Sequence, residues 1–124
     1  LIYNAILNND SEISTEKNIG DPTETCLLEM VERANILKNE TYVNLRNKFL
    51  REEENPFDST RKIMSTQYEI DNKKIVFTKG AVDVLINKIK GISLNGKVKD
   101  IKESDIENIL EFFKKCLQGF SFWI

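Results

Sequence analysis

The sequence predicts an α+β fold, a twisted antiparallel β-sheet flanked by helices. Three neighbouring runs in the middle of the chain are strand-like, and the short polar connections between them are typical of an antiparallel meander. Helical patterns lie before and after these runs without strict alternation, which favours α+β over a parallel α/β sheet. A chain of 124 residues is long enough for one domain with a buried core.

The first part of the chain is predicted to be helical. Residues 1–9 predict a short helix, and a polar loop follows. A second helix begins clearly, with Asp21 as N-cap, Pro22 at its first position and Glu24 at its third. A weaker helical pattern covers residues 40–47. The apolar residues expected to form the stripe of the second helix are Leu27, Leu28, Met30, Val31 and Ala34.

The strand-like runs come next. They read FLREEENPF, RKIMSTQYEI and KKIVFTKG, and their polar connections are DST and DN. The segment AVDVLINKIK then predicts a helix closed by Gly91. After it, ISLNGKV predicts a small hairpin with Asn95 and Gly96 as its turn.

A last helix is expected near the end of the chain. Ser104 and Glu107 have the spacing of a capping box, and apolar residues at helical spacing follow as far as Gly119. The closing run FSFWI predicts a strand over residues 120–124.

Composition and charge exclude several classes of function. The content of 40% hydrophobic and 31% charged residues is that of an ordinary globular domain. The net charge of −2 gives no reason to expect nucleic acid or an anionic membrane as partner. No apolar run approaches the roughly 20 residues that cross a bilayer. Because the chain has no histidine, His-based catalysis and most zinc sites are excluded, and we expect no metal site.

The cysteines and the chain ends indicate a piece of a larger cytosolic protein. Cys26 and Cys116 lie far apart within helical patterns, so we expect both to be reduced and buried. The sequence begins with LIYNAIL, without an initiator Met, and ends in the apolar GFSFWI. No signal peptide is visible. We therefore expect residues 1–124 to be a fragment of a longer chain.

Phe57 and the cations that follow it have two interpretations. Phe57 is either a core aromatic at a strand end or an exposed ring on which a planar ligand stacks. Arg61 and Lys62 are either a solvated pair or the groups that hold the phosphates of a nucleotide.

Lys79 and Glu24 are similarly ambiguous. By period two, Lys79 shares a strand face with Ile75 and Phe77, so it either snorkels at the sheet end or reaches into a pocket. Gly80 beside it would let a ligand approach the backbone. Glu24 either caps its own helix or accepts a hydrogen bond from an amino group. The common phosphate loops and the nucleophile elbow are absent, so nothing resembles a self-contained catalytic site.

Three motifs together suggest a family. GDPTET (20–25), NPFDSTRKIMS (55–65) and FTKGAVDVLI (77–86) occur in the order and approximate spacing of P-type cation-transporting ATPases. The chain resembles the nucleotide-binding (N) domain of these pumps, nearest to the calcium-transporting branch, over nearly its whole length. The resemblance implies that residues 1–124 are one N domain from a longer membrane pump.

The resemblance also implies contacts with the adenine of ATP. Phe57 would stack on the ring, and Lys79 would lie beside it at the pocket floor. Gly80 would allow close approach, and Glu24 would hydrogen-bond near the amino edge.

At the phosphate end, the resemblance assigns the contact to Lys62, with Arg61 in support. The sequence departs from the family at three places. AVD (81–83) replaces the usual Ala-Pro-Glu, Ser59 stands where animal calcium pumps often have Arg, and Ser121 replaces an Arg. The last change removes an expected phosphate contact, so the affinity for ATP is expected to be lower than in relatives.

The resemblance defines an expected function for the parent protein. The domain would bind ATP, with Mg²⁺ in the full pump, and deliver it to an aspartate in a separate domain. Its partners would be the phosphorylation and actuator domains of the same chain. The fragment itself would be a monomeric cytoplasmic domain of an integral membrane protein, binding ATP without hydrolysing it. The alternative is a degenerate N-domain-like interaction module that no longer binds nucleotide.

Overall fold

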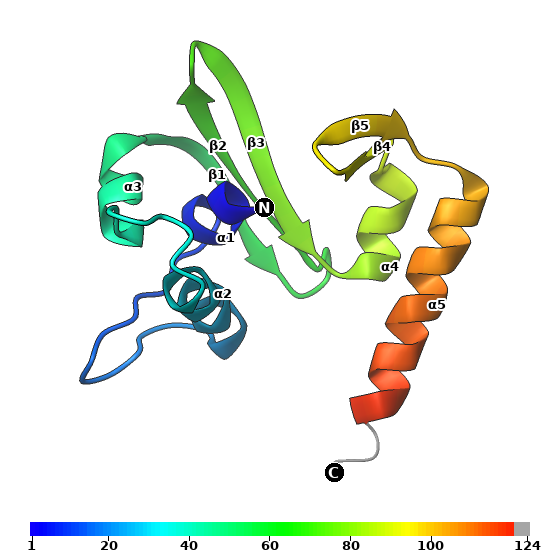
Figure 1. Ribbon diagram of the computed structural model, residues 1–124, viewed down its shortest axis with the longest axis horizontal. Coiled ribbons are helices and arrows are strands. Elements are labelled where there is room, and N and C mark those ends of the chain that lie inside the picture. The colour runs from blue at the N-terminus through cyan, green and yellow to red at the C-terminus, as the bar shows by residue number, and fades with distance from the viewer. Residues whose placement is uncertain (121–124) are drawn as a thin grey trace. The chain divides into compact units, whose positions relative to one another are not determined.

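The structure is a computed structural model that describes residues 1–120. The chain divides into two compact units, of which the first is Leu1–Lys79 and the second begins at Gly80. Its elements, drawn in Figure 1, are α1 (Ile2–Leu7), α2 (Pro22–Arg33), α3 (Tyr42–Lys48), β1 (Arg51–Asp58), β2 (Ile63–Ile70), β3 (Lys73–Gly80), α4 (Val82–Leu85), the 3-10 helix η1 (Ile86–Lys88), β4 (Gly91–Leu94), β5 (Lys97–Asp100) and α5 (Glu103–Phe120). Helices and antiparallel sheets are mixed, which confirms the predicted α+β class.

The first unit contains a three-stranded sheet in the order β1-β2-β3, as the meander predicts. β1 and β2 run antiparallel, with Asp58 opposite Ile63 at the turn. Asp71 and Asn72 join β2 to β3, and both have the positive φ that favours a two-residue hairpin turn. The end of β1, the start of β2 and the end of β3 therefore lie at the same end of the sheet.

The core of this unit lies between the sheet and its helices. Every second residue of β2 is buried, which gives the strand one face packed against the helices. The buried cluster takes residues from α1, α2, α3 and β2, namely Ala5, Ile6, Leu7, Leu28, Val31, Tyr42, Leu45, Tyr68 and Ile70. Ile75 and Phe77 of β3 pack against it, so the predicted strand face is confirmed.

The predicted stripe of α2 is only partly correct. Leu28 and Val31 are buried, and Leu27 packs against the core, but Met30 and Ala34 are exposed. The buried face instead continues through Thr25, three residues before Leu28.

The predicted burial of both cysteines is wrong. Cys26 and Cys116 are free thiols, as expected, but both are exposed. Cys26 lies two residues before Leu28, and two steps of about 100° turn its side chain away from the buried face of α2. Cys116 lies on an exposed part of α5.

The second unit differs from its prediction in its first helix. The expected helix over AVDVLINKIK is only the single turn α4 followed by η1, and Gly91 begins β4 instead of closing a helix. The carbonyl of Lys90 accepts a hydrogen bond from the Ile101 N–H (3.1 Å), so Lys90 already extends the neighbouring hairpin. That hairpin is confirmed, with Asn95 and Gly96 at positive φ between β4 and β5.

The start and end of α5 also differ from the prediction. The helix begins at Glu103, so Ser104 lies inside it and the predicted capping box is wrong. The carboxylate of Asp105 instead accepts the Lys102 N–H (3.1 Å). α5 continues past Gly119 to Phe120, and the rest of the predicted strand, with Ser121, lies outside the described residues. Within residues 1–120, no helix is both long enough and apolar enough to cross a membrane.

Candidate functional site

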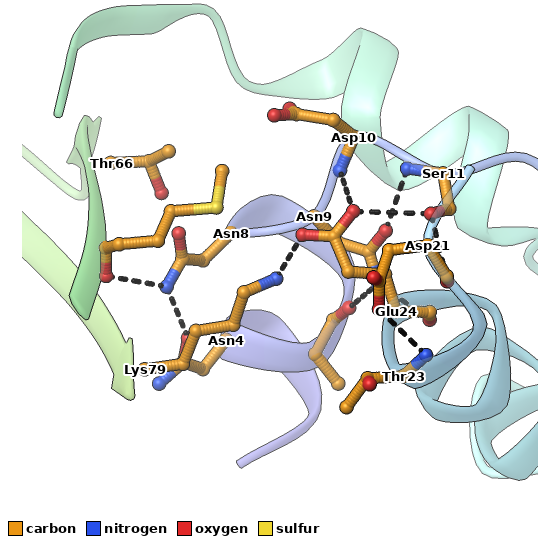
Figure 2. A network of polar contacts seen from close by, with 12 residues as sticks. Asn4, Asn8, Asn9, Asp10, Ser11, Asp21, Thr23, Glu24, Thr66 and Lys79 are labelled. Carbon is orange, nitrogen blue, oxygen red and sulfur yellow. Dashed lines mark hydrogen bonds and ion pairs between the residues drawn. The ribbon is translucent and has the colours of Figure 1, made fainter. Parts of the chain in front are cut away.

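Glu24 and Lys79 form an ion pair that joins the start of α2 to the end of β3. The Lys79 ammonium contacts Oε1 of Glu24, and the two side chains are only 24% and 15% exposed, respectively. The other oxygen, Oε2, accepts hydrogen bonds from the Asp10 N–H and the Ser11 hydroxyl, each at 3.1 Å. Figure 2 shows both side chains reaching toward the segment that follows α1.

The interpretation of Glu24 as a cap of its own helix is wrong. Asp21 is the N-cap, as predicted, and its Oδ1 accepts the Thr23 N–H at 2.8 Å. This backbone hydrogen bond lowers the pKa of Asp21 below the ordinary value for an aspartate. With the helix end capped by Asp21, the Glu24 carboxylate is directed to groups from other parts of the chain.

Two arginines that the sequence analysis did not single out hold the segment next to Glu24. Arg46 of α3 donates to the carbonyls of Ile6, Asn9 and Ser11 at 2.8–3.0 Å. Burial lowers the pKa of Arg46 from its ordinary value. Arg51 of β1 donates to the Leu7 carbonyl (3.1 Å).

The charge of Arg51 is supported by several neighbours. Burial acts against its charged form, but hydrogen bonds with Tyr68, Asp10 and Glu54 outweigh burial and raise the pKa of Arg51 above its ordinary value. The only local signal of this arrangement is the polar triplet Asn8-Asn9-Asp10 directly after the buried end of α1.

Phe57 is exposed, which overturns the interpretation of this residue as a core aromatic. Its side chain is 62% exposed at the penultimate position of β1. The register between β1 and β2 shifts between Asn55 and Asp58, so the regular alternation of faces is interrupted at this ring. Lys79 is the penultimate residue of β3 and therefore lies at the same end of the sheet as Phe57.

Arg61 and Lys62 lie in the turn between β1 and β2. Arg61 is bound to the turn itself, because its guanidinium donates to the Pro56 carbonyl (2.7 Å) and lies 3.9 Å from the Asp58 carboxylate. Lys62 is exposed and has φ 55°, and its N–H donates to the Asp58 carbonyl (2.6 Å). Both cations thus lie in the turn that follows Phe57, and Asp58 bonds to both of them.

Gly80 ends β3 and is the first residue of the second unit. Its role in ligand approach stays a prediction.

A cavity in the described part of the chain lies apart from the predicted site residues. It has a volume of about 240 Å³ and is lined by Val31, Glu32, Asn35 and residues 37–41 at the connection between α2 and α3, and none of the predicted site residues lines it. Among the described residues, no three His, Cys, Asp or Glu side chains are grouped so that they could hold a metal ion.

Comparison with known proteins identifies the family. The family model described as "P-type ATPase, cytoplasmic domain N" matches residues 1–118. Calcium-transporting ATPases of Listeria monocytogenes and Bacillus cereus are each 39% identical to this chain over 90% of its length. A calcium-transporting ATPase of Lactococcus lactis is 41% identical over 81% of the chain.

The matched regions are small parts of these relatives. The chain covers 12% of the Listeria protein, 12% of the Bacillus protein and 11% of the Lactococcus protein. The family match, over residues 1–118, and the agreement in fold class are nevertheless sufficient to assign the chain to a family. The chain belongs to the P-type ATPase family, as its cytoplasmic N domain.

Proposed function

We propose that this domain binds ATP by its adenine and delivers it to a phosphorylatable aspartate in another domain of a cation-transporting pump. In this proposal residues 1–124 are one domain of that pump. The names of its relatives favour calcium as the transported ion. The observation that carries the proposal is the exposed ring of Phe57 at the same end of the sheet as Lys79, which pairs with Glu24 of α2.

The adenine end has the chemistry that a purine requires. Phe57 offers an open aromatic face, and stacking a base on such a ring contributes roughly 1–3 kcal/mol. β2 separates Phe57 from Lys79, so their backbones are about 10 Å apart, which leaves room for a flat ring between the side chains. Glu24 supplies a carboxylate that accepts from the adenine amino group, and Gly80 permits close approach of the ligand.

The phosphate end is assigned to the turn that follows Phe57. The exposed ammonium of Lys62 binds the phosphates, and Arg61 supports it by holding the turn through Pro56 and Asp58. Mg²⁺ enters with the nucleotide and neutralises phosphate charge in the full pump. The phosphorylation and actuator domains of the parent chain are the partners, and the domain alone binds ATP as a monomer without hydrolysing it.

The second candidate is a degenerate interaction module that no longer binds nucleotide. It is favoured by the sequence departures AVD (81–83) and Ser121. The retained set of contact residues argues against it, because the exposed ring of Phe57, the Glu24 carboxylate and the Lys79 ammonium, which the proposed adenine contact requires, are all present.

Substitution of Phe57 separates the two candidates. We expect Phe57→Ala to weaken ATP binding about tenfold or more, which corresponds to losing about 1.4 kcal/mol or more of stacking. Because the ring is exposed, the free energy of unfolding should change by less than about 0.5 kcal/mol. The affinity is measured by NMR titration, and the stability by urea unfolding.

Phe112→Ala is the matched control, since Phe112 is 71% exposed and lies in α5 of the second unit. It should leave both the affinity and the stability near those of the wild type. Equal affinity in the Phe57→Ala variant and the wild type would contradict the proposed stack. A wild-type domain with no saturable ATP binding would favour the degenerate module.

A further inference from the structure

The Glu24 carboxylate is held so that one acceptor position is left over. Ser11 and the Asp10 N–H occupy Oε2, and Lys79 occupies Oε1. An ionised carboxylate has about four lone-pair positions, two on each oxygen. Three are therefore in use, and the fourth is on Oε1, next to the Lys79 ammonium (Figure 2).

Ser11 is fixed in place independently of Glu24. Its side chain is fully buried, and Gly20, at φ 114°, packs so closely against it that a Cβ there would collide with the Ser11 hydroxyl. Its N–H donates to Asn9 Oδ1 (2.9 Å), and its carbonyl accepts from Arg46 (2.8 Å). The Ser11 hydroxyl is thus a donor whose position is set by the fold.

The same segment also holds the backbone of Glu24. The side-chain amide of Asn9 donates to the Glu24 carbonyl at 2.9 Å, and to the Ala5 carbonyl at 3.0 Å. Arg46 in turn binds the Asn9 carbonyl (2.9 Å). Both the main chain and the carboxylate of Glu24 are therefore hydrogen-bonded to one segment, residues 9–11.

We propose that Ser11 is a positioning residue that orients the free acceptor of Glu24 and so sets a preference for 6-amino over 6-oxo purine nucleotides. The inference rests on the proposed ATP-binding function. A carboxylate accepts the 6-amino group of adenine but has no proton to offer a 6-oxo group. When Ser11 no longer donates to Oε2, the Asp10 N–H still holds that oxygen but one of its two donors is lost. The carboxylate then turns more freely and reaches the N1–H of a 6-oxo purine, so discrimination falls.

ATP and ITP test this orientation, because they share the ribose and the triphosphate and differ at purine position 6. The quantity measured is the ratio of the Kd for ITP to the Kd for ATP, by NMR titration of the domain. In the Ser11→Ala variant this ratio should fall about fivefold, the effect of losing one typical hydrogen bond. If Ser11 had a purely structural role, its loss would weaken the binding of both nucleotides equally and leave the ratio unchanged.

Ser14→Ala is the matched control. Its hydroxyl bonds with the Lys17 backbone in the same loop, so its loss perturbs the loop away from Glu24. The Ser14→Ala ratio should equal that of the wild type. If Ser11→Ala does not fold, Ser11→Cys retains a side chain of similar shape with a much weaker donor, and should lower the ratio in the same direction.

The outcomes separate this inference from the proposed function. The role of Ser11 is overturned, with ATP binding left intact, if the wild type binds ATP with a ratio of the two Kd values near one. It is overturned equally if the Ser11 variants do not change that ratio. Absence of saturable binding to either nucleotide overturns both. A lowered ratio in the Ser11 variants, with Ser14→Ala unchanged, supports the inference.

Discussion

Glu24 and Phe57, proposed to contact the amino edge and the face of adenine, respectively, are held in opposite ways. The Glu24 carboxylate is mostly buried and bonded to Ser11, Asp10 and Lys79. Phe57 is mostly exposed and lies where the strand register shifts. The difference fits the two interactions, because a hydrogen bond depends on direction whereas a stack needs chiefly an open aromatic face. Substitutions on the Glu24 side should therefore cost more stability than substitutions in the turn beside Phe57.

The largest loss is expected from Arg46→Met. This change removes the donor of three backbone carbonyls in the segment that holds Glu24. The carbonyls of Ile6 and Ser11 lose this donor, and that of Asn9 keeps the longer hydrogen bond from Arg51 (3.4 Å). This loss should lower the free energy of unfolding by about 3 kcal/mol or more, measured by urea unfolding. Arg33→Met is the control, since the Arg33 side chain is 81% exposed and bonds to Glu29 on its own helix, and it should cost less than about 0.5 kcal/mol. Equal losses in the two variants would show that Arg46 does not hold the segment.

Breaking the ion pair should have the next largest effect. Lys79→Met leaves the mostly buried Glu24 carboxylate without its cation, at a cost of about 2 kcal/mol in the free energy of unfolding. The double variant Glu24→Gln/Lys79→Met removes both charges, so its loss should be smaller than the sum of the two single losses. Strictly additive losses in this double-mutant cycle would mean that the two side chains do not interact.

The turn beside Phe57 should be the least sensitive. Asp58 Oδ1 accepts the N–H groups of Thr60 (3.0 Å) and Arg61 (2.7 Å). Asp58→Ala removes this acceptor and should cost about 1 kcal/mol, with a weaker affinity for ATP because Lys62 loses its fixed position. Asp58→Asn keeps an oxygen at the same place and should retain most of the stability. A loss in Asp58→Ala as large as that in Arg46→Met would reverse the proposed order of the two sides.

The sequence predicted well those features that depend on neighbouring residues. Asp21 as N-cap, the hairpin turn at Asn95-Gly96 and the alternation in β3 all follow from local chemistry, and all are confirmed. The exposure of Phe57 could not be decided in this way, because the register shift in β1 interrupts the period of two on which such a decision depends. The motifs that place the chain in its family supplied the site residues where local patterns left them ambiguous.

The polar contacts of Glu24 were beyond prediction from local pattern. Lys79 is 55 residues from Glu24, and Arg46 reaches backbone groups 35–40 residues away. Such bonds depend on the packing of α1 and α3 and leave no periodic signal in the sequence. The two exposed cysteines and the short α4 show the same limit, since a local pattern does not tell which helix face or how many turns the tertiary structure will use.

The central claim is tested most directly by titrating the isotope-labelled domain with ATP and then with AMP, without added magnesium, and following its NMR spectrum. The account predicts saturable shifts at Glu24, Phe57 and Lys79 that are similar for both nucleotides, because the adenine provides most of the recognition. Shifts at Lys62 should be larger for ATP, which carries the additional phosphates. No saturable shifts at millimolar ATP, or shifts confined to Arg61 and Lys62, would contradict an adenine-binding site.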